Sequence, residues 1–205
     1  MPPTPEAVIF DMDDVLCRYD FGTRLARMAQ MTGVDAATIE RVVFAEGFDA
    51  RADAGEYTAE AYHREFCRRI GARLSVAQWL EARAASITPD AEVLDMARRV
   101  AQRARIALLT NNGPLLEAHI GRVFPQVAEL FGEHVYFSCS LGASKPDPRV
   151  FAAVVARLGA TPGATLFIDD SAEYVGGAVE AGLDTHHFQS AAGLRRALED
   201  RGLIG

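Results

Sequence analysis

The chain has 205 residues, enough for one domain or for one core with a smaller insert. Hydrophobic residues make up 49% and charged residues 24%, which argues against both a disordered chain and a membrane protein. The formal net charge is −7 and no basic tract is present, so the electrostatic footprint of a nucleic-acid-binding protein is missing. We therefore expect a small-molecule partner, with neither nucleic acid nor membrane involved.

Cysteine content and the N-terminal residues indicate the compartment. The three cysteines, Cys17, Cys67 and Cys139, are odd in number and widely spaced, which is typical of reduced thiols. Residues 1–10 carry no basic segment ahead of their apolar stretch, and the apolar runs are far shorter than the ~20 residues that cross a bilayer. These features predict a cytoplasmic protein, and they leave its oligomeric state open.

The first expected element is a buried strand at residues 7–10, which ends at Asp11. The region that follows contains helical patterns and no convincing strand. Three apolar stripes precede Gly33, Gly47 and Gly71, each a plausible helix C-terminus, and Ser75 with Gln78 forms a capping box for a fourth helix. Residues 17–87 are therefore predicted to form a helical insert.

After the insert, strand and helix patterns alternate. Thr88 and Pro89 resemble the N-cap and first residue of a helix whose apolar stripe covers 92–100. Strands are predicted at 106–109 and 166–168, with weaker candidates at 134–137 and 186–188, and a helix at 147–158. This alternation predicts a Rossmann-like parallel α/β sheet flanked by helices, with residues 1–16 and 88–205 as the core.

Polar residues follow the predicted strands at the points where each strand ends. In open parallel sheets, such residues converge in one crevice at the carboxyl edge. The residues expected there are Asp11, Asp13, Thr110, Asn111, Asp169 and Asp170, with Lys145 from the loop ahead of the 147–158 helix. So many carboxylates repel one another unless a cation offsets them, and oxygen ligands without histidine or cysteine favour Mg²⁺. Lys145 and Thr110 could then hold phosphate oxygens.

Four segments in this order resemble the motifs of the haloacid dehalogenase-like hydrolases, in particular the phosphatases with a helical cap inserted after the first strand. The segments are residues 10–16 (Phe-Asp-Met-Asp-Asp-Val-Leu), 108–112 (Leu-Leu-Thr-Asn-Asn), 144–148 (Ser-Lys-Pro-Asp-Pro) and 167–171 (Phe-Ile-Asp-Asp-Ser). Residues 53–58 are similar to a turn that is common in such caps. The resemblance covers nearly the whole chain, and it implies that 17–87 is a cap.

The resemblance implies a Mg²⁺-dependent phosphatase that hydrolyses a small phosphate monoester, with a sugar phosphate as the expected substrate class. Asp11 would attack phosphorus to form an aspartyl phosphate, and Asp13 would protonate the leaving oxygen and then activate water. Thr110, Asn111 and Lys145 would bind the phosphoryl group. The metal ligands would be Asp11, the backbone carbonyl of Asp13 and Asp170, with Asp169 in support.

Two positions depart from the family pattern. Asp14 stands where many relatives carry glycine, which adds a negative charge beside the site. Tyr174 stands where relatives with the Asp-Asp form of the fourth motif often have asparagine, so a supporting hydrogen bond is expected to be absent or replaced by the phenol.

Other functions remain open at this stage. A dehalogenase has no need of an acid in the second position of the first motif, so Asp13 argues against it. A sugar phosphomutase uses the same aspartyl phosphate and is the main alternative. A receiver-like signalling domain also combines carboxylates, Thr, Lys and Mg²⁺, but the large helical insert would be unexplained. The substrate would be selected in the cap, and the candidates there are Arg18, Tyr19, Phe48 and Arg51.

Overall fold

The computed structural model describes residues 4–205, so residues 1–3 of the predicted core lie outside the described residues. Its centre is a five-stranded sheet in the order β5-β4-β1-β6-β7, in which every neighbouring pair is parallel. The strands are β1 (Ala7–Phe10), β4 (Arg105–Thr110), β5 (Val135–Phe137), β6 (Thr165–Asp169) and β7 (Asp184–His187). The predicted parallel α/β sheet is confirmed, and β1 is its central strand.

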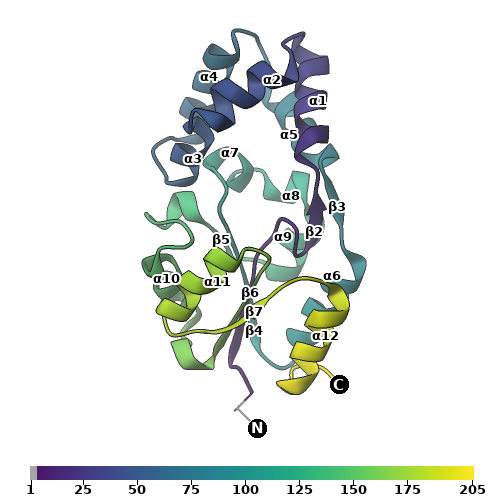
Figure 1. Ribbon diagram of the computed structural model, residues 1–205, viewed down its shortest axis with the longest axis vertical. Coiled ribbons are helices and arrows are strands. Elements are labelled where there is room, and N and C mark those ends of the chain that lie inside the picture. Colours follow the sequence, from purple (N-terminus) through teal and green to yellow (C-terminus); the bar gives the residue numbers. More distant parts are fainter. Residues whose placement is uncertain (1–3) are drawn as a thin grey trace.

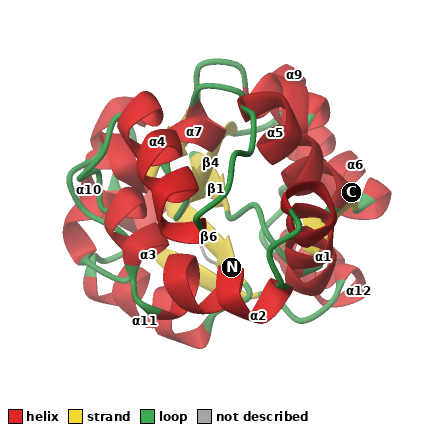
Figure 2. Ribbon diagram, turned by 90° about the horizontal axis from the view of Figure 1, so that it is seen from above, coloured by secondary structure: helices red, strands yellow, loops and turns green. Residues whose placement is uncertain are grey.

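Helices cover both faces of this sheet (Figures 1 and 2). On one face α10 (Pro148–Leu158) packs on β4, and α11 (Ala172–Glu180) packs on β6 and β7. On the other face lie α6 (Ala91–Val100), α9 (Pro125–Phe131) and α12 (Ala191–Asp200). The short helices α7 (Pro114–Glu117) and α8 (Ile120–Val123) and the 3₁₀ turns η2 (Ser138–Ser140) and η3 (Pro162–Ala164) connect them.

The helical insert, residues 21–85, rises above the carboxyl edge of the sheet (Figure 1). Its elements are α1 (Phe21–Thr32), α2 (Ala36–Ile39), the π-helical segment η1 (Glu40–Ala45), α3 (Phe48–Asp53), α4 (Ala59–Ile70) and α5 (Val76–Ala85). Gly33 and Gly71 end α1 and α4 in the left-handed conformation, and both bonds of the Ser75–Gln78 capping box are present. The boundaries of a cap at 17–87 stay a prediction.

One part of the sequence reading was wrong. Residues 87–89 do not begin a helix: they form strand β3 (Ile87–Pro89), which pairs antiparallel with β2 (Cys17–Tyr19). The N-cap of α6 is Asp90, whose carboxylate accepts from the backbone N–H groups of Glu92 and Val93. Three-residue strands carry too little periodicity to be recognised in a sequence. The two strands therefore connect the insert to the sheet at adjacent points.

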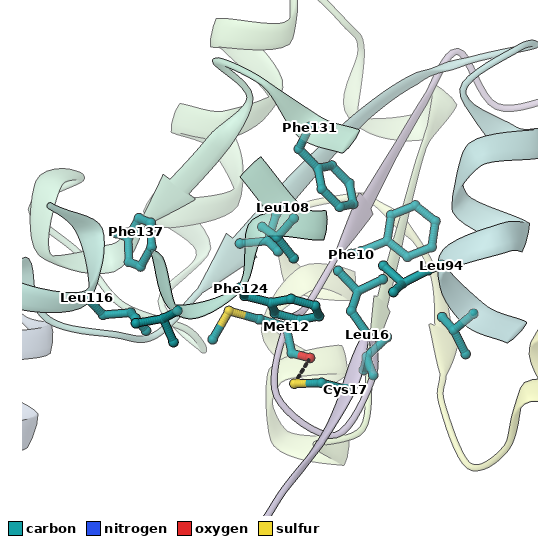
Figure 3. Close-up of a cluster of buried hydrophobic side chains, with 14 of the residues drawn as sticks. Phe10, Met12, Leu16, Cys17, Leu94, Leu108, Leu116, Phe124, Phe131 and Phe137 are labelled. Carbon is teal, nitrogen blue, oxygen red and sulfur yellow. Dashed lines mark hydrogen bonds between the residues drawn. The ribbon is translucent and has the colours of Figure 1, made fainter. Parts of the chain in front are cut away.

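Strand residues alternate between two apolar clusters because successive side chains point to opposite faces of the sheet. Ile9 and Phe167 pack under α10, whereas Phe10 and Leu108 belong to the larger cluster on the other face. Figure 3 shows Phe10 against Phe131, with Met12 and Leu16 continuing the cluster. The same cluster runs on into the insert, where it includes Phe66 and Trp79. Apolar contact thus links the insert to the site edge of the sheet.

Candidate active site

The reactive edge of the sheet lies beyond the carboxyl ends of β1, β4 and β6. A cleft of about 240 Å³ opens there. Its walls are formed by Asp11, Asp13, Asp14, Thr110, Asn111, Asn112, Lys145, Asp170, Ser171 and Tyr174. These residues come from four segments of the chain, and they include every sequence-predicted catalytic, phosphate-binding and metal-binding residue except Asp169.

Lys145 lies at the base of this cleft between two carboxylates. Its Nζ is 2.6 Å from Oδ1 of Asp11 and 2.7 Å from Oδ2 of Asp169, and its side chain is only 1% exposed. Burial by itself would lower the pKa of the Lys145 ammonium, but the two carboxylates outweigh that effect and raise it. Lys145 is therefore a fixed positive charge that holds Asp11 and Asp169 together.

Asp11 follows β1 directly, and its backbone N–H continues the sheet ladder to Ile168. Burial is the largest influence on this carboxyl and raises its pKa to about 7, while the ion pair with Lys145 acts in the opposite direction. Asp169 and Asp13 add repulsion. The site thus gathers negative charge that a further cation in the cleft would offset.

The two consecutive aspartates after β6 have different surroundings. Asp169 is fully buried, and its Oδ1 accepts from the backbone N–H of Ser171 at 2.8 Å while Oδ2 contacts Lys145. Asp170 is exposed and lines the cleft. Oxygen atoms of Asp11, Asp169 and Asp170 lie within 4.8 Å of one another, a set of hard ligands suited to a divalent cation such as Mg²⁺.

Thr110 ends β4 and Asn111 follows it, and both side chains form hydrogen bonds within the protein. The Thr110 hydroxyl accepts from Nδ2 of Asn112 at 2.7 Å. The Asn111 amide bonds the backbone of Lys145 through both of its polar atoms. Binding of a phosphoryl group at this strand end would therefore depend on the Thr110 hydroxyl proton and on backbone N–H groups.

Asp13 contacts Arg83 and Asn112, which were not predicted from the sequence to belong to the site. Nη2 of Arg83, on α5, lies 2.7 and 2.6 Å from its two carboxylate oxygens, and Nδ2 of Asn112 lies 3.3 Å from Oδ2. Asn112 lies just beyond the end of a predicted strand, so its place at the site could have been predicted from the sequence. Arg83 could not be predicted in this way, because only the fold brings it across 70 positions to Asp13.

The structure gives physical reasons for both departures from the family pattern. Asp14 has φ +59°, the left-handed region that favours glycine, and its Oδ1 accepts from the backbone N–H of Tyr19 at 2.9 Å. Tyr174 presents its ring to Lys145, with Nζ 4.9 Å from the ring centre. Tyr174 therefore makes a cation–π contact with the site lysine.

A second, enclosed cavity of about 10 Å³ lies between the insert and the sheet, with room for about one water molecule. Its lining residues are Arg24, Asp49, Asp53, Tyr62, Trp79, Asn112, Gly113, Leu115 and Leu116. Asn112 lines both cavities. Within residues 4–205, the buried Nε of Arg24 and Nε1 of Trp79 have no hydrogen-bond partner. Two of the residues that line this cavity thus carry buried donors without a partner.

None of the four residues predicted to select substrate lines either of these two cavities. Phe48 is fully buried and stacks on Tyr62, and Arg51 bonds the Tyr57 hydroxyl at the surface. Arg18 is exposed on β2. Tyr19 accepts from Arg24 through its hydroxyl. Contact of these residues with a substrate stays a prediction.

The comparisons identify the family. A model of the haloacid dehalogenase-like hydrolases matches residues 5–182, and the chain belongs to this family. Phosphatase MT3486 of Mycobacterium tuberculosis (strain CDC 1551 / Oshkosh) is 30% identical, over 97% of this chain and 95% of the relative. The predicted resemblance to this family is confirmed.

Two solved structures are similar over nearly their whole length. A predicted HAD-like family hydrolase from Porphyromonas gingivalis has a TM-score of 0.79 and 26% identity, covering 95% of this chain and 98% of that one. The HAD family enzyme bt-2542 of Bacteroides thetaiotaomicron, in complex with magnesium and inorganic phosphate, has a TM-score of 0.74 and 21% identity, covering 90% of this chain and 94% of that one.

In residues 4–205, no helix is both long and apolar enough to cross a membrane.

Proposed function

We propose that this hydrolase is a Mg²⁺-dependent phosphatase that cleaves a small phosphate monoester through an aspartyl phosphate on Asp11. The observation that carries the proposal is the Lys145 ammonium between Asp11 and Asp169, with Asp13 and Asp170 facing the same cleft. The similarity to a protein named as a phosphatase supports it, as does the similarity in fold to an enzyme that binds magnesium and phosphate.

The arrangement of carboxylates supports a division of labour in metal binding. Both oxygens of Asp169 already accept hydrogen bonds, whereas Asp170 is exposed at the cleft. We therefore assign Asp11, Asp170 and the backbone carbonyl of Asp13 as ligands and give Asp169 a supporting role. The bound cation would offset the charge of the carboxylates and of the transferring phosphoryl group.

The reaction follows from the positions of Asp11 and Asp13, which both line the cleft beyond β1. An oxygen of Asp11 attacks phosphorus in line, and the bond from phosphorus to the leaving oxygen breaks while Asp13 gives that oxygen a proton. In the second half, Asp13 takes a proton from water, which attacks phosphorus and releases Asp11 and inorganic phosphate. Lys145 and Thr110 bind the phosphoryl oxygens throughout.

The enclosed cavity beneath the insert supports a hydroxyl-bearing leaving group, so we keep a sugar phosphate as the substrate class. Asp49 and Asp53 offer carboxyl groups that can bond hydroxyl groups, and Arg24 and Trp79 offer unused donors. The cavity holds about one water molecule in the position seen here, so a sugar would enter it only if the insert moved as a cap. We place this reaction in the cytoplasm, where free thiols such as the three here stay reduced.

The first test is phosphate release from a panel of phosphorylated metabolites and p-nitrophenyl phosphate. EDTA should abolish release and Mg²⁺ restore it; full activity after exhaustive chelation would overturn the metal dependence. Asp170→Ala should raise the Mg²⁺ concentration needed for half-maximal activity more than Asp169→Ala does. The reverse order would mean that Asp169 is the metal ligand and Asp170 the supporting residue.

A second test locates the intermediate. Rapid acid quench during turnover, followed by mass spectrometry of peptides, should find phosphate on Asp11 and none in Asp11→Asn. Phosphate on another residue, or turnover by Asp11→Asn, would refute the mechanism. Return of the phosphoryl group to a second substrate hydroxyl would point to the mutase alternative.

A further inference from the structure

Arg83 binds the carboxylate of Asp13 across the boundary between the insert and the sheet. Its Nη2 lies 2.7 Å from Oδ1 and 2.6 Å from Oδ2, a contact short enough for a charge-assisted hydrogen bond. Arg83 is in the last turn of α5, whereas Asp13 is in the loop that follows β1. The insert therefore supplies the cation that holds one carboxylate of the core.

The guanidinium of Arg83 is itself buried, and within residues 4–205 its Nε has no hydrogen-bond partner. The side chain is 1% exposed, its Cζ lies 4.4 Å from the centre of the Tyr19 ring, and Nη1 is 3.5 Å from the Ser86 hydroxyl. Arg83 lines neither the cleft nor the enclosed cavity. It can therefore act on a substrate only through Asp13.

Asp13 has few other restraints. Its side chain is 23% exposed, and its remaining contacts are Nδ2 of Asn112 at 3.3 Å and the Cys17 thiol at 3.7 Å, both longer than the contacts with Arg83. Without the guanidinium, the carboxylate would have more than one rotamer open to it. Its direction toward the cleft therefore depends on Arg83.

We propose that Arg83 is a positioning residue that orients Asp13 for acid–base catalysis and does so only while the insert lies in the position seen here. This inference rests on the proposed function of Asp13. Asp13 lies just before β2 and Arg83 just before β3, and these strands pair with Tyr19 opposite Ile87. A movement of the insert about these strands would separate the pair. Asp13 would therefore be aligned for acid–base catalysis only when the insert is closed over the sheet.

The test compares Arg83→Met and Arg83→Lys with the wild type. Arg83→Met should lower kcat on the order of 10- to 100-fold, as expected for a misplaced catalytic group, with KM changed much less. With p-nitrophenyl phosphate, whose leaving group needs little protonation, hydrolysis of the intermediate should slow more than its formation, so aspartyl phosphate should accumulate. Arg83→Lys should recover part of kcat.

The Asp13→Asn background separates positioning from a general effect on the fold. If Arg83 acts through Asp13, adding Arg83→Met to Asp13→Asn should change kcat less than twofold. Arg69→Met is the matched control, because Arg69 packs over the Phe48 ring inside the insert and has no contact with Asp13. Its kcat should stay near that of the wild type.

Two results would overturn the inference: an Arg83→Met enzyme with wild-type kcat, or an equal fold-loss from Arg83→Met in the wild-type and Asp13→Asn backgrounds. Thermal unfolding of each variant shows whether it is folded, and Arg83→Lys repeats the comparison if Arg83→Met is not. A wild-type enzyme that releases no phosphate from any monoester would overturn the proposed function itself, which is a separate readout.

Discussion

The side-chain amide of Asn111 forms two reciprocal hydrogen bonds with the backbone of Lys145. Its Oδ1 accepts from the Lys145 N–H at 3.0 Å, and its Nδ2 donates to the Lys145 carbonyl at 2.9 Å. The end of β4 thereby fixes the loop whose ammonium pairs with Asp11 and Asp169. Asn111 thus contributes to the site by holding Lys145, in addition to any backbone contact with phosphate.

Both Asn111→Ala and Asn111→Asp should therefore weaken the site. Alanine removes both hydrogen bonds, worth about 1–3 kcal/mol together, whereas aspartate keeps the acceptor for the Lys145 N–H but sets a carboxylate oxygen against the Lys145 carbonyl and adds negative charge to the site. We expect kcat/KM to fall roughly tenfold or more for Asn111→Ala, and steady-state kinetics will measure it. Equal activity of Asn111→Ala and the wild type would contradict a role for this pair of bonds.

Gly177 on α11 should not tolerate a side chain, whereas its neighbour Gly176 should. A Cβ on Gly177 would clash with the Pro146 carbonyl oxygen, but a Cβ on Gly176 would meet nothing within 4 Å. Gly177→Ala should lower the free energy of unfolding by about 1–3 kcal/mol and reduce activity, because it pushes α11 away from the Lys145 loop.

The matched control, Gly176→Ala, should raise the free energy of unfolding by up to about 1 kcal/mol, since alanine is the better helix former. Urea unfolding and phosphatase assays of both variants check the pair. A Gly177→Ala protein as stable and active as Gly176→Ala would show that α11 and the loop do not need this close approach.

Asp53 should make stability depend on pH. Burial, and repulsion from Asp49, raise the pKa of its carboxyl to about 8 in the folded protein, against about 3.9 in an unfolded chain. Between these values the unfolded state releases a proton that the folded state keeps, so the free energy of unfolding falls as pH rises from about 4 to about 8. Asp53→Asn removes this effect. Its Tm relative to the wild type should therefore increase from pH 5 to pH 8, and a constant difference would contradict the argument.

Asp14 should be replaceable by asparagine or glycine but not by alanine. Asparagine keeps an acceptor for the Tyr19 N–H and tolerates the left-handed conformation, and glycine relieves that conformation while losing the bond. Alanine loses the bond and retains the strain, at a cost of about 1–2 kcal/mol. Urea unfolding of the three variants gives the order; an alanine variant as stable as the asparagine variant would contradict it.

The sheet and most of the long helices could be predicted because each has its own local pattern. Strands such as 7–10 and 166–168 are continuous apolar runs that end in carboxylates, and the helices that end at Gly33 and Gly71 have apolar stripes and a stop. Strands β2 and β3 were missed since their pairing is a long-range property: Arg18 and Thr88 are partners only after the insert has folded.

The residues of the candidate site likewise include some that could be predicted from the sequence and some that could not. Residues that directly follow strands could be predicted to lie together, because the carboxyl ends of parallel strands share one edge of the sheet. Arg83 could not be found, because a helical arginine near a C-terminus is normally explained by solvent exposure and the helix dipole. The cavity residues Arg24 and Asp49 were also missed, since only the packing of α1 and α3 over the sheet makes them face Asn112.

The pairing of β2 with β3 has a consequence for how freely the segment between them can change. Because these strands hold both ends of that segment together, the entropy of closing it depends only weakly on its length, and a doubling adds about 0.6 kcal/mol. A longer, shorter or different segment could be spliced between Tyr19 and Ile87 without altering the register of the central sheet. The requirement on any replacement is to cover the apolar side chains of Leu115 and Leu116 and to return one cation to Asp13.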